Sequence, residues 1–527
     1  MSAKKNASKS SPAGDDGAHA LTDGPSPDAT ASPEHWRVRV RMHRQGVGDC
    51  FLLTFRNGGD KTHVLIDCGV LPASPAEFNR LESVVELIRS EIANNGGKLD
   101  VIVVTHEHAD HVSAFLPGTR TAQILKDIPS DEVWMAWTEN PDDELARKLS
   151  GALSIQALAA ASVLERVTRI GISSTSSFAR RAGRTAGNIN DILENFGISG
   201  SMDGDTIKQS WNEAHSSRKA PLAAKISRTV REAMNNAKSH ATQGKFRTFV
   251  PGQAPHSLPG ISKDKIRVYV LGPPRIENLK KSPRHGPTDD IFHLAAGELP
   301  ALARSLAAAS LPSDSATESC SPFSDKWQQR IDSVGTENLE NQKARYHSAK
   351  WRKIDDDWLM SGGDFAMQLD SATNNSSLVL AFEMVETGEV LLFPGDAQIE
   401  NWETWRNLSW MIPDQSGALT KITGEDLLRR TVFYKVGHHG SHNATLNEHG
   451  LQLMPSDGLV AMLPVIHAVT AKRKGDWKEI PKPSLCKALE KRCGEGFIRM
   501  DAEKGSLPGR LGGRIQEHEL YIDYYLV

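Results

Sequence analysis

The sequence predicts a layered α/β protein, in which helices cover a β-sheet. Residues 36–43 alternate with period two, and residues 51–55 and 62–69 are apolar or β-branched runs, so we expect three strands there. Residues 83–100 have the pattern of an amphipathic helix stopped by Asn-Gly-Gly. That helix leads into residues 101–104, Val-Ile-Val-Val, which are apolar on both faces, as a central strand of such a sheet would be.

Further strands are expected along the rest of the chain. Residues 131–137 and 266–274 have strand character. Residues 377–396 predict a hairpin with its turn at Glu386-Thr387-Gly388, and residues 431–440 predict a strand that ends in two histidines. Because side chains from distant sequence converge at strand ends in layered α/β proteins, we expect a site there.

The chain is expected to form one domain at residues 35–527, preceded by a disordered tail at residues 1–34. The tail has almost no large apolar side chains, so its burial could not offset the entropy lost on ordering. Two insertions are expected in the domain. Residues 145–250 are Ala-rich and helical in pattern, whereas residues 275–365 are polar and poorly periodic.

Composition excludes several classes of protein. The 527 residues are 39% hydrophobic, with 62 Lys and Arg against 65 Asp and Glu, so no global basic field indicates a polyanionic partner. The five cysteines form no C-x-x-C pair, which favours a reducing compartment. The sequence shows neither a signal peptide nor the roughly 18–20 consecutive apolar residues of a membrane span, so we expect a cytoplasmic protein without membrane contact.

A loop rich in metal-ligating side chains follows the strand at 101–104. It contains His106, His108, Asp110 and His111. A helical H-E-x-x-H zinc site is excluded because position 110 is Asp. In a loop, two donors could reach one metal and two a second, with Asp396 bridging them. Each histidine alone could be an ordinary core or surface residue, but four such groups buried together would be costly without a cation.

These motifs resemble the metallo-β-lactamase superfamily. THEHADH matches its H-x-H-x-D-H pattern, while GVGDCFLLTF, LIDCG, NNSSLVLAFE, LLFPGD and KVGHHGS resemble its ComEC-like branch. That branch includes the nuclease-like domain of a DNA-uptake protein and phosphorylcholine esterases. The resemblance covers about residues 36–140 and 266–490. It implies a four-layer αββα sandwich interrupted by the two insertions.

The resemblance also implies a set of site residues. The implied metal ligands are His106, His108, Asp110, His111, Asp396, His438 and His439. The first two would bind one metal, the next two the other, and Asp396 would lie between them. One of His438 and His439 would complete the second site, and which of them does so is left open. We expect Asp110, His438 and His439 to take part in catalysis. Asp67 would orient the histidine loop as an acceptor for a metal-bound imidazole, or else simply form a turn.

The sequence departs from the family pattern at three places. Ser113-Ala114 replaces the usual Gly-Gly after the histidine loop, and Lys482-Pro483 replaces a late His-Pro. The separate histidine of the third motif has no clear counterpart. Its unplaced candidates are His240, His256, His285 and His293. Three outcomes are open: a weakly held metal, a substitute residue from an insertion, or a site that has drifted from catalysis.

The expected chemistry is hydrolysis. Mixed His and Asp donors suit zinc, manganese or iron, and we expect two divalent ions, zinc or manganese. Two cations would turn a bridging water into hydroxide near neutral pH, and phosphodiesters gain most from such a site. Lys435 and Ser441 are expected to contact the phosphoryl group, although Lys435 could instead be a solvated strand residue. A β-lactamase activity is disfavoured, because fold alone does not transfer activity.

Any binding of nucleic acid is expected to be confined to one segment of the chain. Residues 207–247 carry an excess of Lys and Arg that could follow a nucleic-acid backbone or form a solvated helical face. Nucleic acid and a partner protein therefore both remain open. The second functional hypothesis is a binding or regulatory module of a multi-protein system with an impaired metal site. Four tryptophans could rim a pocket or pack in the core: Trp137, Trp402, Trp405 and Trp410.

Overall fold

The computed structural model describes most of the domain predicted from the sequence. The described residues are 33–71, 75–172, 177–196, 228–242, 245–275, 340–341, 366–367, 369–413, 417–455, 457–473, 475–507 and 509–527. Most of the predicted tail, nearly all of the predicted irregular insertion and residues 207–227 of the basic segment lie outside them.

One sheet has eight strands and contains the elements expected before residue 140. Its strands are β1 (Val38–His43), β2 (Cys50–Asn57), β3 (Asp60–Cys68), β4 (Leu99–Val103), β5 (Ser130–Ala136), β6 (Phe246–Phe249), β15 (Ile515–Glu517) and β16 (Tyr521–Leu526). The order is β15-β16-β1-β2-β3-β4-β5-β6. β1, β2 and β3 pair antiparallel, whereas β3, β4, β5 and β6 run parallel, as expected for strands joined through helical crossovers. The strands predicted in this region are confirmed.

The other large sheet has six strands from the later part of the chain. Its strands are β7 (Ile266–Gly272), β8 (Val379–Met384), β9 (Glu389–Phe393), β12 (Thr431–Lys435), β13 (Val460–Leu463) and β14 (Phe497–Arg499), in the order β14-β13-β12-β9-β8-β7. The β8–β9 hairpin is confirmed, with Gly388 at a positive φ of 73° in its turn. β9 and β12 are parallel neighbours, so their carboxyl ends open at the same edge. β10 (Ser409–Pro413) and β11 (Leu419–Thr423) form a separate two-stranded sheet.

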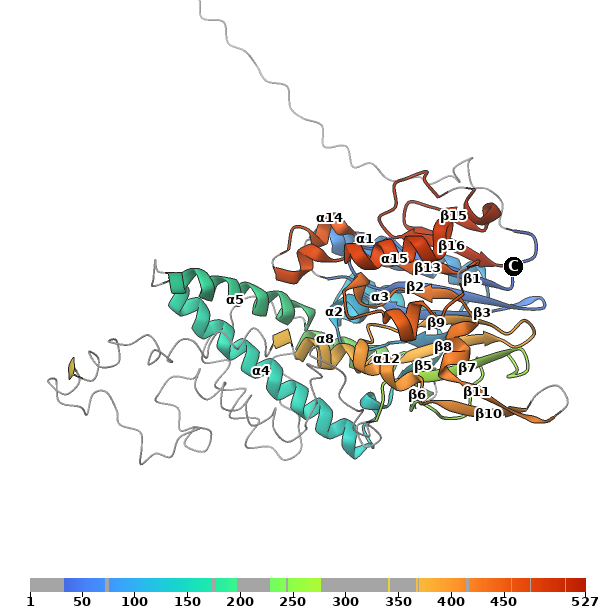
Figure 1. Ribbon diagram of the computed structural model, residues 1–527, viewed down its shortest axis with the longest axis horizontal. Helices are drawn as coiled ribbons and strands as arrows, with labels where there is room; N and C mark the ends of the chain where they lie inside the picture. The colour runs from blue at the N-terminus through green and yellow to red at the C-terminus, as the bar shows by residue number, and fades with distance from the viewer. Residues whose placement is uncertain are drawn as a thin grey trace, which may run out of the picture.

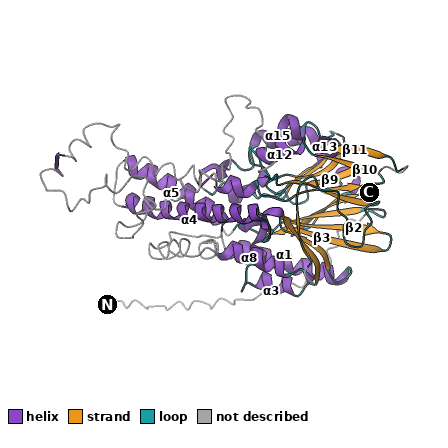
Figure 2. Ribbon diagram, turned by 90° about the horizontal axis from the view of Figure 1, so that it is seen from below, coloured by secondary structure: helices purple, strands orange, loops and turns teal. Residues whose placement is uncertain are grey.

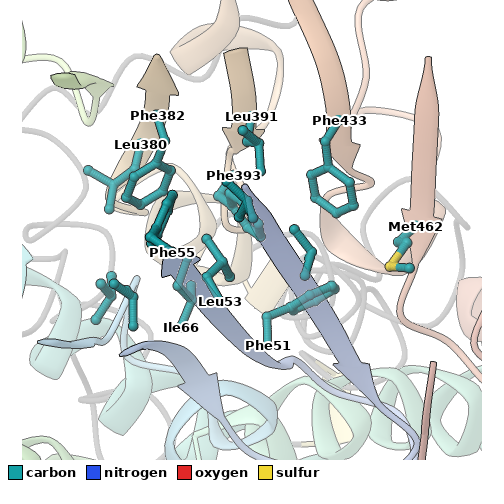
Figure 3. Packing of buried hydrophobic residues seen from close by; sticks show 14 of the residues in the cluster. Phe51, Leu53, Phe55, Ile66, Leu380, Phe382, Leu391, Phe393, Phe433 and Met462 are labelled. Carbon is teal, nitrogen blue, oxygen red and sulfur yellow. The ribbon is translucent and has the colours of Figure 1, made fainter. Parts of the chain in front are cut away.

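The two large sheets pack against each other through an apolar core. The ring of Phe51 lies 5.8 Å from that of Phe393, edge to face, and the ring of Phe55 lies 5.6 Å from that of Phe382. Figure 3 shows these side chains interdigitating between strands of the two sheets. Close-packed aromatic pairs of this kind fix the distance between the sheets, and so hold the loops at their shared edge in one place.

Helices cover the outer face of each sheet (Figure 2). The apolar sides of α1 (Pro75–Asn94), α3 (Arg120–Lys126) and α8 (Arg228–Ser239) pack with the eight-stranded sheet. Those of α12 (Ile399–Trp405), α13 (Gly424–Arg429) and α15 (Pro483–Cys493) pack with the six-stranded sheet. Trp137, Trp402, Trp405 and Trp410 are all buried, so they pack in the core. The predicted mixed α/β architecture with helix-covered sheets is confirmed.

Helices α4 (Glu144–Ile172) and α5 (Ser177–Asn195) pack together and extend away from the sheets (Figure 1). With α8, they occupy much of the segment predicted to be helical. Phe246–Phe249, at the end of that segment, is instead strand β6 of the eight-stranded sheet, so the helical prediction is wrong there. Shorter helical elements are α2 (Ala109–Val112), α14 (His467–Thr470), η1 (Ser113–Phe115), η2 (Trp137–Glu139), η9 (His438–Gly440), η10 (Asn447–Leu451), η11 (Gly475–Glu479), η12 (Gly494–Gly496) and η13 (Arg510–Gly513). Among the described helices, none has the length and apolar character needed to cross a bilayer.

Helix α8 is attached to the protein by a partly buried ionic cluster around Glu139. One oxygen of Glu139 accepts hydrogen bonds from Arg231 Nη1 and Lys238 Nζ, each at 2.9 Å, and Arg231 also pairs with Glu107 of the histidine loop. Burial would raise the pKa of Glu139, but the neighbouring Arg231 and Lys238 outweigh it and lower that pKa to about 2. Glu139 therefore stays ionised in the folded protein.

Replacing Glu139 with Gln is expected to lower the free energy of unfolding by about 3 kcal/mol at pH 7, because it leaves two cations partly buried without their shared partner. The folded-state pKa is below the ordinary value of 4.5. The stabilisation is therefore present above about pH 4.5 and is lost as pH falls toward about 2. Urea titrations of both proteins between pH 7 and 3 measure the difference. Glu144→Gln, at an exposed position, is the matched control; a difference that stays constant with pH would contradict the ion-pair explanation.

Candidate metal centre

The histidine loop runs from the end of β4 into the short helix α2. His108 has extended backbone angles (φ −119°, ψ 150°), and its carbonyl accepts hydrogen bonds from the backbone N–H groups of His111 and Val112. Asp110 and His111 therefore lie on the first turn after the loop. The side chains of His106, His108, Asp110 and His111 are all buried. The loop predicted in place of a zinc-binding helix is confirmed up to residue 108.

Two glycines let the chain pack directly against this loop. The N–H of Asp49 donates to the carbonyl of Asp110 at 2.9 Å. A Cβ on Gly48 would lie 2.6 Å from that carbonyl oxygen, and a Cβ on Gly69 would lie 2.4 Å from the carbonyl carbon of Asp110. Only glycine allows backbones to approach this closely. The G-x-G-D-C and D-C-G stretches thus fix the position of Asp110.

Side chains from three distant segments converge around one point. Oxygens of Asp110 and Asp396 and nitrogens of His111 and His439 all lie within 4.8 Å of one another. The Nε2 atom of His439 is 2.6 Å from Asp110 Oδ2, and the Nε2 atom of His111 is 3.2 Å from Asp396 Oδ2. Two ligands 2.0–2.1 Å from a tetrahedral zinc lie roughly 3.3 Å apart. The group therefore has the donor chemistry and spacing of a metal site.

His106 and His108 form a second pair of donors beside this group. The Nε2 atom of His106 lies 3.1 Å from the Nδ1 atom of His108. The Nδ1–H of His106 faces the hydroxyl oxygen of Thr105 at 3.0 Å, which leaves its Nε2 lone pair directed inward. The ring centroids of His106 and His111 are 4.1 Å apart, so the two groups of donors adjoin.

Oxygen acceptors outside the centre orient the other imidazoles. Asp67, at the end of β3 with a φ of 54°, accepts the Nδ1–H of His111 at 2.8 Å and the N–H and hydroxyl of Thr105 at 2.8 and 2.7 Å. The Nδ1–H of His439 donates to the carbonyl of Pro464 at 3.0 Å. Each contact leaves the Nε2 lone pair facing the centre, as in metal sites generally. Asp67 is thus placed where an orienting acceptor is needed.

Lys435 lies inside the protein rather than on its surface. Its side chain is 2% exposed. Its ammonium group pairs with Asp49 and contacts Asp396 Oδ1 at 3.1 Å and the carbonyl of Gly395 at 2.9 Å. The alternative of a solvated strand residue is therefore wrong. The predicted contact between Lys435 and substrate stays a prediction, and it would require the ammonium group to leave these oxygens.

The two histidines after β12 have different places. His438 and His439 both adopt positive φ values (45° and 52°), and Gly440 follows at 77°, so the chain turns sharply there. This turn directs His439 into the four-residue group and leaves His438 at its edge, partly exposed. The Nδ1–H of His438 faces the Ser441 hydroxyl oxygen at 2.8 Å, and its Nε2 atom is 3.4 Å from the Asn374 amide nitrogen.

Burial and the neighbouring charges shift the pKa values of the imidazoles in the centre. Burial, together with neighbouring imidazoles, lowers the pKa of His106 well below its ordinary value. Burial also opposes protonation of His111, but Asp396 and Asp110 outweigh it and raise the pKa of His111. Asp110 Oδ1 is a buried oxygen without a hydrogen-bond partner among the described residues. Two buried carboxylates beside several imidazoles provide a fitting environment for a divalent cation.

Several residues considered for the centre lie elsewhere. His240 packs against Phe115, and His256 packs against Phe249; His285 and His293 lie outside the described residues. Lys482 pairs with Glu479. The hydroxyl of Ser113, which replaces a family glycine, donates to the carbonyl of Val70 at 3.1 Å and accepts the Val70 N–H at 2.9 Å, so it ties the loop to the segment after β3.

Two carboxylates near the centre were not foreseen from the sequence. Asp49 pairs with Lys435 and lies 3.8 Å from His111 Nδ1. Its position inside G-V-G-D-C, directly before β2, is the sequence signal that could have indicated it. Asp370 lies 3.7 Å from His108 Nε2. No pattern in its surroundings pointed to it.

Comparison with known proteins agrees with this description. The family model described as the metallo-beta-lactamase superfamily matches residues 43–207, which include Asp49, Asp67 and the whole histidine loop. Members of this superfamily are generally hydrolases and typically bind divalent metals. Residues 43–207 thus match a metallo-β-lactamase superfamily domain, and the buried His and Asp residues of the centre could hold a divalent metal. A search of curated proteins finds no match.

Proposed function

We propose that the protein is a metal-dependent hydrolase of the ComEC-like branch that cleaves phosphodiester bonds with two divalent metals, zinc or manganese. The observation that carries the proposal is the convergence of Asp110, His111, Asp396 and His439 within 4.8 Å, beside His106 and His108. The proposed frame is the four-layer αββα domain at residues 35–527 with insertions at 145–250 and 275–365. Two face-to-face sheets with helices on both outer sides support it.

In this proposal His106 Nε2 and His108 Nδ1 hold one metal, and Asp110, His111 and His439 hold the other. Asp396 Oδ2 faces the second group, while its Oδ1 accepts the N–H of His438 at 2.9 Å and contacts Lys435. When bound, the metals supply a water acidic enough to act as a nucleophile and neutralise charge on the attacked group.

His438 is the proposed proton donor to the leaving oxygen. Burial, opposed in part by nearby carboxylates, lowers its pKa to about 4, so His438 is neutral near pH 7. It would first accept the proton that the attacking water gives up and then pass it to the leaving oxygen. Its Nδ1–H is held by Ser441, and its Nε2 atom is directed toward Asn374, where the ring is partly exposed. His438 is therefore placed at this edge to meet a substrate. Ser441 is buried and holds His438, and a contact between Ser441 and substrate is part of the proposal.

The choice between nucleic acid and a small phosphodiester depends on the basic segment at 207–247. Three of its described cations already have partners, because Arg231 and Lys238 pair with Glu139 and Arg247 pairs with Glu132. Nucleic-acid binding would therefore rest mainly on residues 207–227, which are outside the described part. We propose nucleic acid as the leading substrate and a small phosphodiester as the next candidate, because the resemblance to the ComEC-like branch favours this order.

The test is a substrate panel with zinc or manganese added. It contains single- and double-stranded DNA, RNA, a cyclic dinucleotide and a nitrophenyl phosphodiester. His108→Ala and Asp396→Ala are each expected to lower turnover by about a hundredfold or more, because the nucleophile depends on the metals. His240→Ala, which removes an imidazole packed against Phe115, is the matched control. Equal turnover by wild type and both site variants would mean that the activity comes from elsewhere.

The alternative function is a binding or regulatory module with an impaired metal site. It is motivated by the number of metal donors, because neither group of possible metal donors found among the described residues contains His106 or His108. Metal content after mild purification discriminates between the two functions. About two equivalents per chain support the hydrolase, whereas one or none supports the module.

A further inference from the structure

The ring nitrogen of His108 that points away from His106, Nε2, faces the carboxylate of Asp370, which is remote in the sequence. His106, His111 and His439 each have their outer nitrogen on an oxygen acceptor at 2.8–3.0 Å. The Nε2 atom of His108 is buried and has no hydrogen-bond partner among the described residues, and Asp370 Oδ1 is 3.7 Å away. The imidazole of His108 therefore has a possible acceptor, Asp370, close by but beyond hydrogen-bond distance.

Asp370 is held in this position from two sides. Its Oδ1 accepts a hydrogen bond from Asn195 Nδ2 at 2.9 Å, and its Oδ2 accepts one from Asn374 Nδ2 at 3.0 Å. Asn195 ends helix α5, and Asn374 lies just before β8. A carboxylate with one donor on each oxygen has its direction fixed, yet each oxygen keeps a lone pair for a further donor.

The end of α5 also contacts His108 directly. The ring of Phe196 meets the His108 ring edge to face, with centroids 4.9 Å apart and an interplanar angle of 87°. Glu194, two residues before Phe196, pairs with Arg473. Three consecutive residues of the helical insertion, Glu194, Asn195 and Phe196, thus bind three different parts of the surroundings of the centre. This attachment places the insertion against the histidine loop.

We propose that Asp370 is the positioning residue of His108. By accepting the Nε2–H, it selects the tautomer whose Nδ1 lone pair lies 3.1 Å from His106 Nε2, where both nitrogens can bind one metal. The two ring nitrogens lie on different edges of the imidazole, so a carboxylate beside Nε2 orients the ligand from outside. A closure of about 0.8 Å would bring Asp370 to hydrogen-bond distance. The inference rests on the proposed function, because it assigns the metal to the His106–His108 pair.

This role also explains how the centre tolerates the absent third-motif histidine. With only two imidazoles on that side, their orientation decides how well a metal is held. Asp370 supplies that orientation, and Asn195 of the helical insertion holds Asp370 in place. A residue outside the family motifs therefore compensates for the missing histidine by positioning an existing ligand.

The test compares Asp370→Ala, Asp370→Asn and Asn195→Ala with wild type, and uses the exposed Asp142→Asn as the matched control. Zinc affinity is measured by competition with a chelator. Asp370→Ala is expected to weaken the more loosely bound zinc by about 10- to 100-fold and leave the other unchanged, because outer partners of ligating histidines have effects of this size. Asp370→Asn, nearly isosteric and still an acceptor, should give a smaller loss, and Asn195→Ala a smaller one still.

The second readout is the tautomer of His108, observed by nitrogen NMR of metal-free protein. Wild type should carry its proton on Nε2, whereas Asp370→Ala should populate the Nδ1–H form as well. This measurement separates the inference from the proposed function. Wild-type protein that binds no zinc would contradict the proposed function, yet the tautomer would still report on Asp370. Unchanged zinc affinity and tautomer in Asp370→Ala and Asp370→Asn would overturn the inference.

Discussion

Replacement of Lys435 by Met is expected to lower the free energy of unfolding by about 3–5 kcal/mol. The ammonium group of Lys435 lies between the carboxylates of Asp49 and Asp396, and all three side chains are buried. Burial would lower the pKa of Lys435, but the two carboxylates outweigh it and hold that pKa above its ordinary value. Methionine fills a similar volume and removes the charge. Two neighbouring buried carboxylates then lose the cation that compensates them.

Urea denaturation at pH 7 measures this loss, with Lys421→Met on the exposed strand β11 as the matched control. The control should change the free energy of unfolding by less than about 0.5 kcal/mol. A second expected result is a shift of the Asp49 pKa. Burial already raises that pKa to about 6 despite Lys435, and the variant should raise it further. If Lys435→Met were as stable as wild type, compensation of these carboxylates by Lys435 would be excluded.

The sequence predicted the strands well because the local hydrophobic pattern of each segment agrees with its position in the folded sheet. Residues 62–69 and 101–104 are strongly apolar and β-branched, and they became the central parallel strands β3 and β4. The alternation at 36–43 also predicted a strand, but it did not show that the polar side chains of this strand would be buried. Arg39 and Arg41 of β1 are buried with Glu91 and Asp523 rather than exposed to solvent. Alternation indicates two faces, and only the packed structure shows what covers the polar one.

The convergence of distant motifs was predictable from topology. Asp396 follows β9 and His439 follows β12, and these strands are parallel neighbours, so their ends meet at one edge. The inward direction of Lys435 was not predictable, because a strand-end lysine is ordinarily solvated. Its burial becomes favourable through contacts with Asp49, Asp396 and the carbonyl of Gly395. Asp370 was not predictable either. Its position depends on Asn195, 175 residues earlier in the chain, and no local pattern encodes that contact.

Substitution of Gly48 by Ala is expected to destabilise the protein by about 4 kcal/mol and to disturb zinc binding by the centre. A Cβ at this position would lie 2.5 Å from the carbonyl oxygen of Gly69 and 2.6 Å from that of Asp110. Both are backbone atoms, so no side chain can rotate away, and the clash costs about 1–3 kcal/mol. The φ of Gly48 is 148°, a conformation nearly restricted to glycine, which adds about 1–3 kcal/mol. The histidine loop must move for the methyl group to fit.

Gly96→Ala separates the two contributions. Gly96 also has a positive φ, 116°, but a Cβ there would meet nothing within 4 Å. It should therefore show only the conformational cost and keep wild-type zinc affinity. Because Asp110 moves with the carbonyl that Gly48 approaches, Gly48→Ala should weaken zinc binding as well as stability. Equal losses of stability in the two variants, with zinc affinity unchanged in both, would mean that close packing against Asp110 is not what requires glycine at position 48.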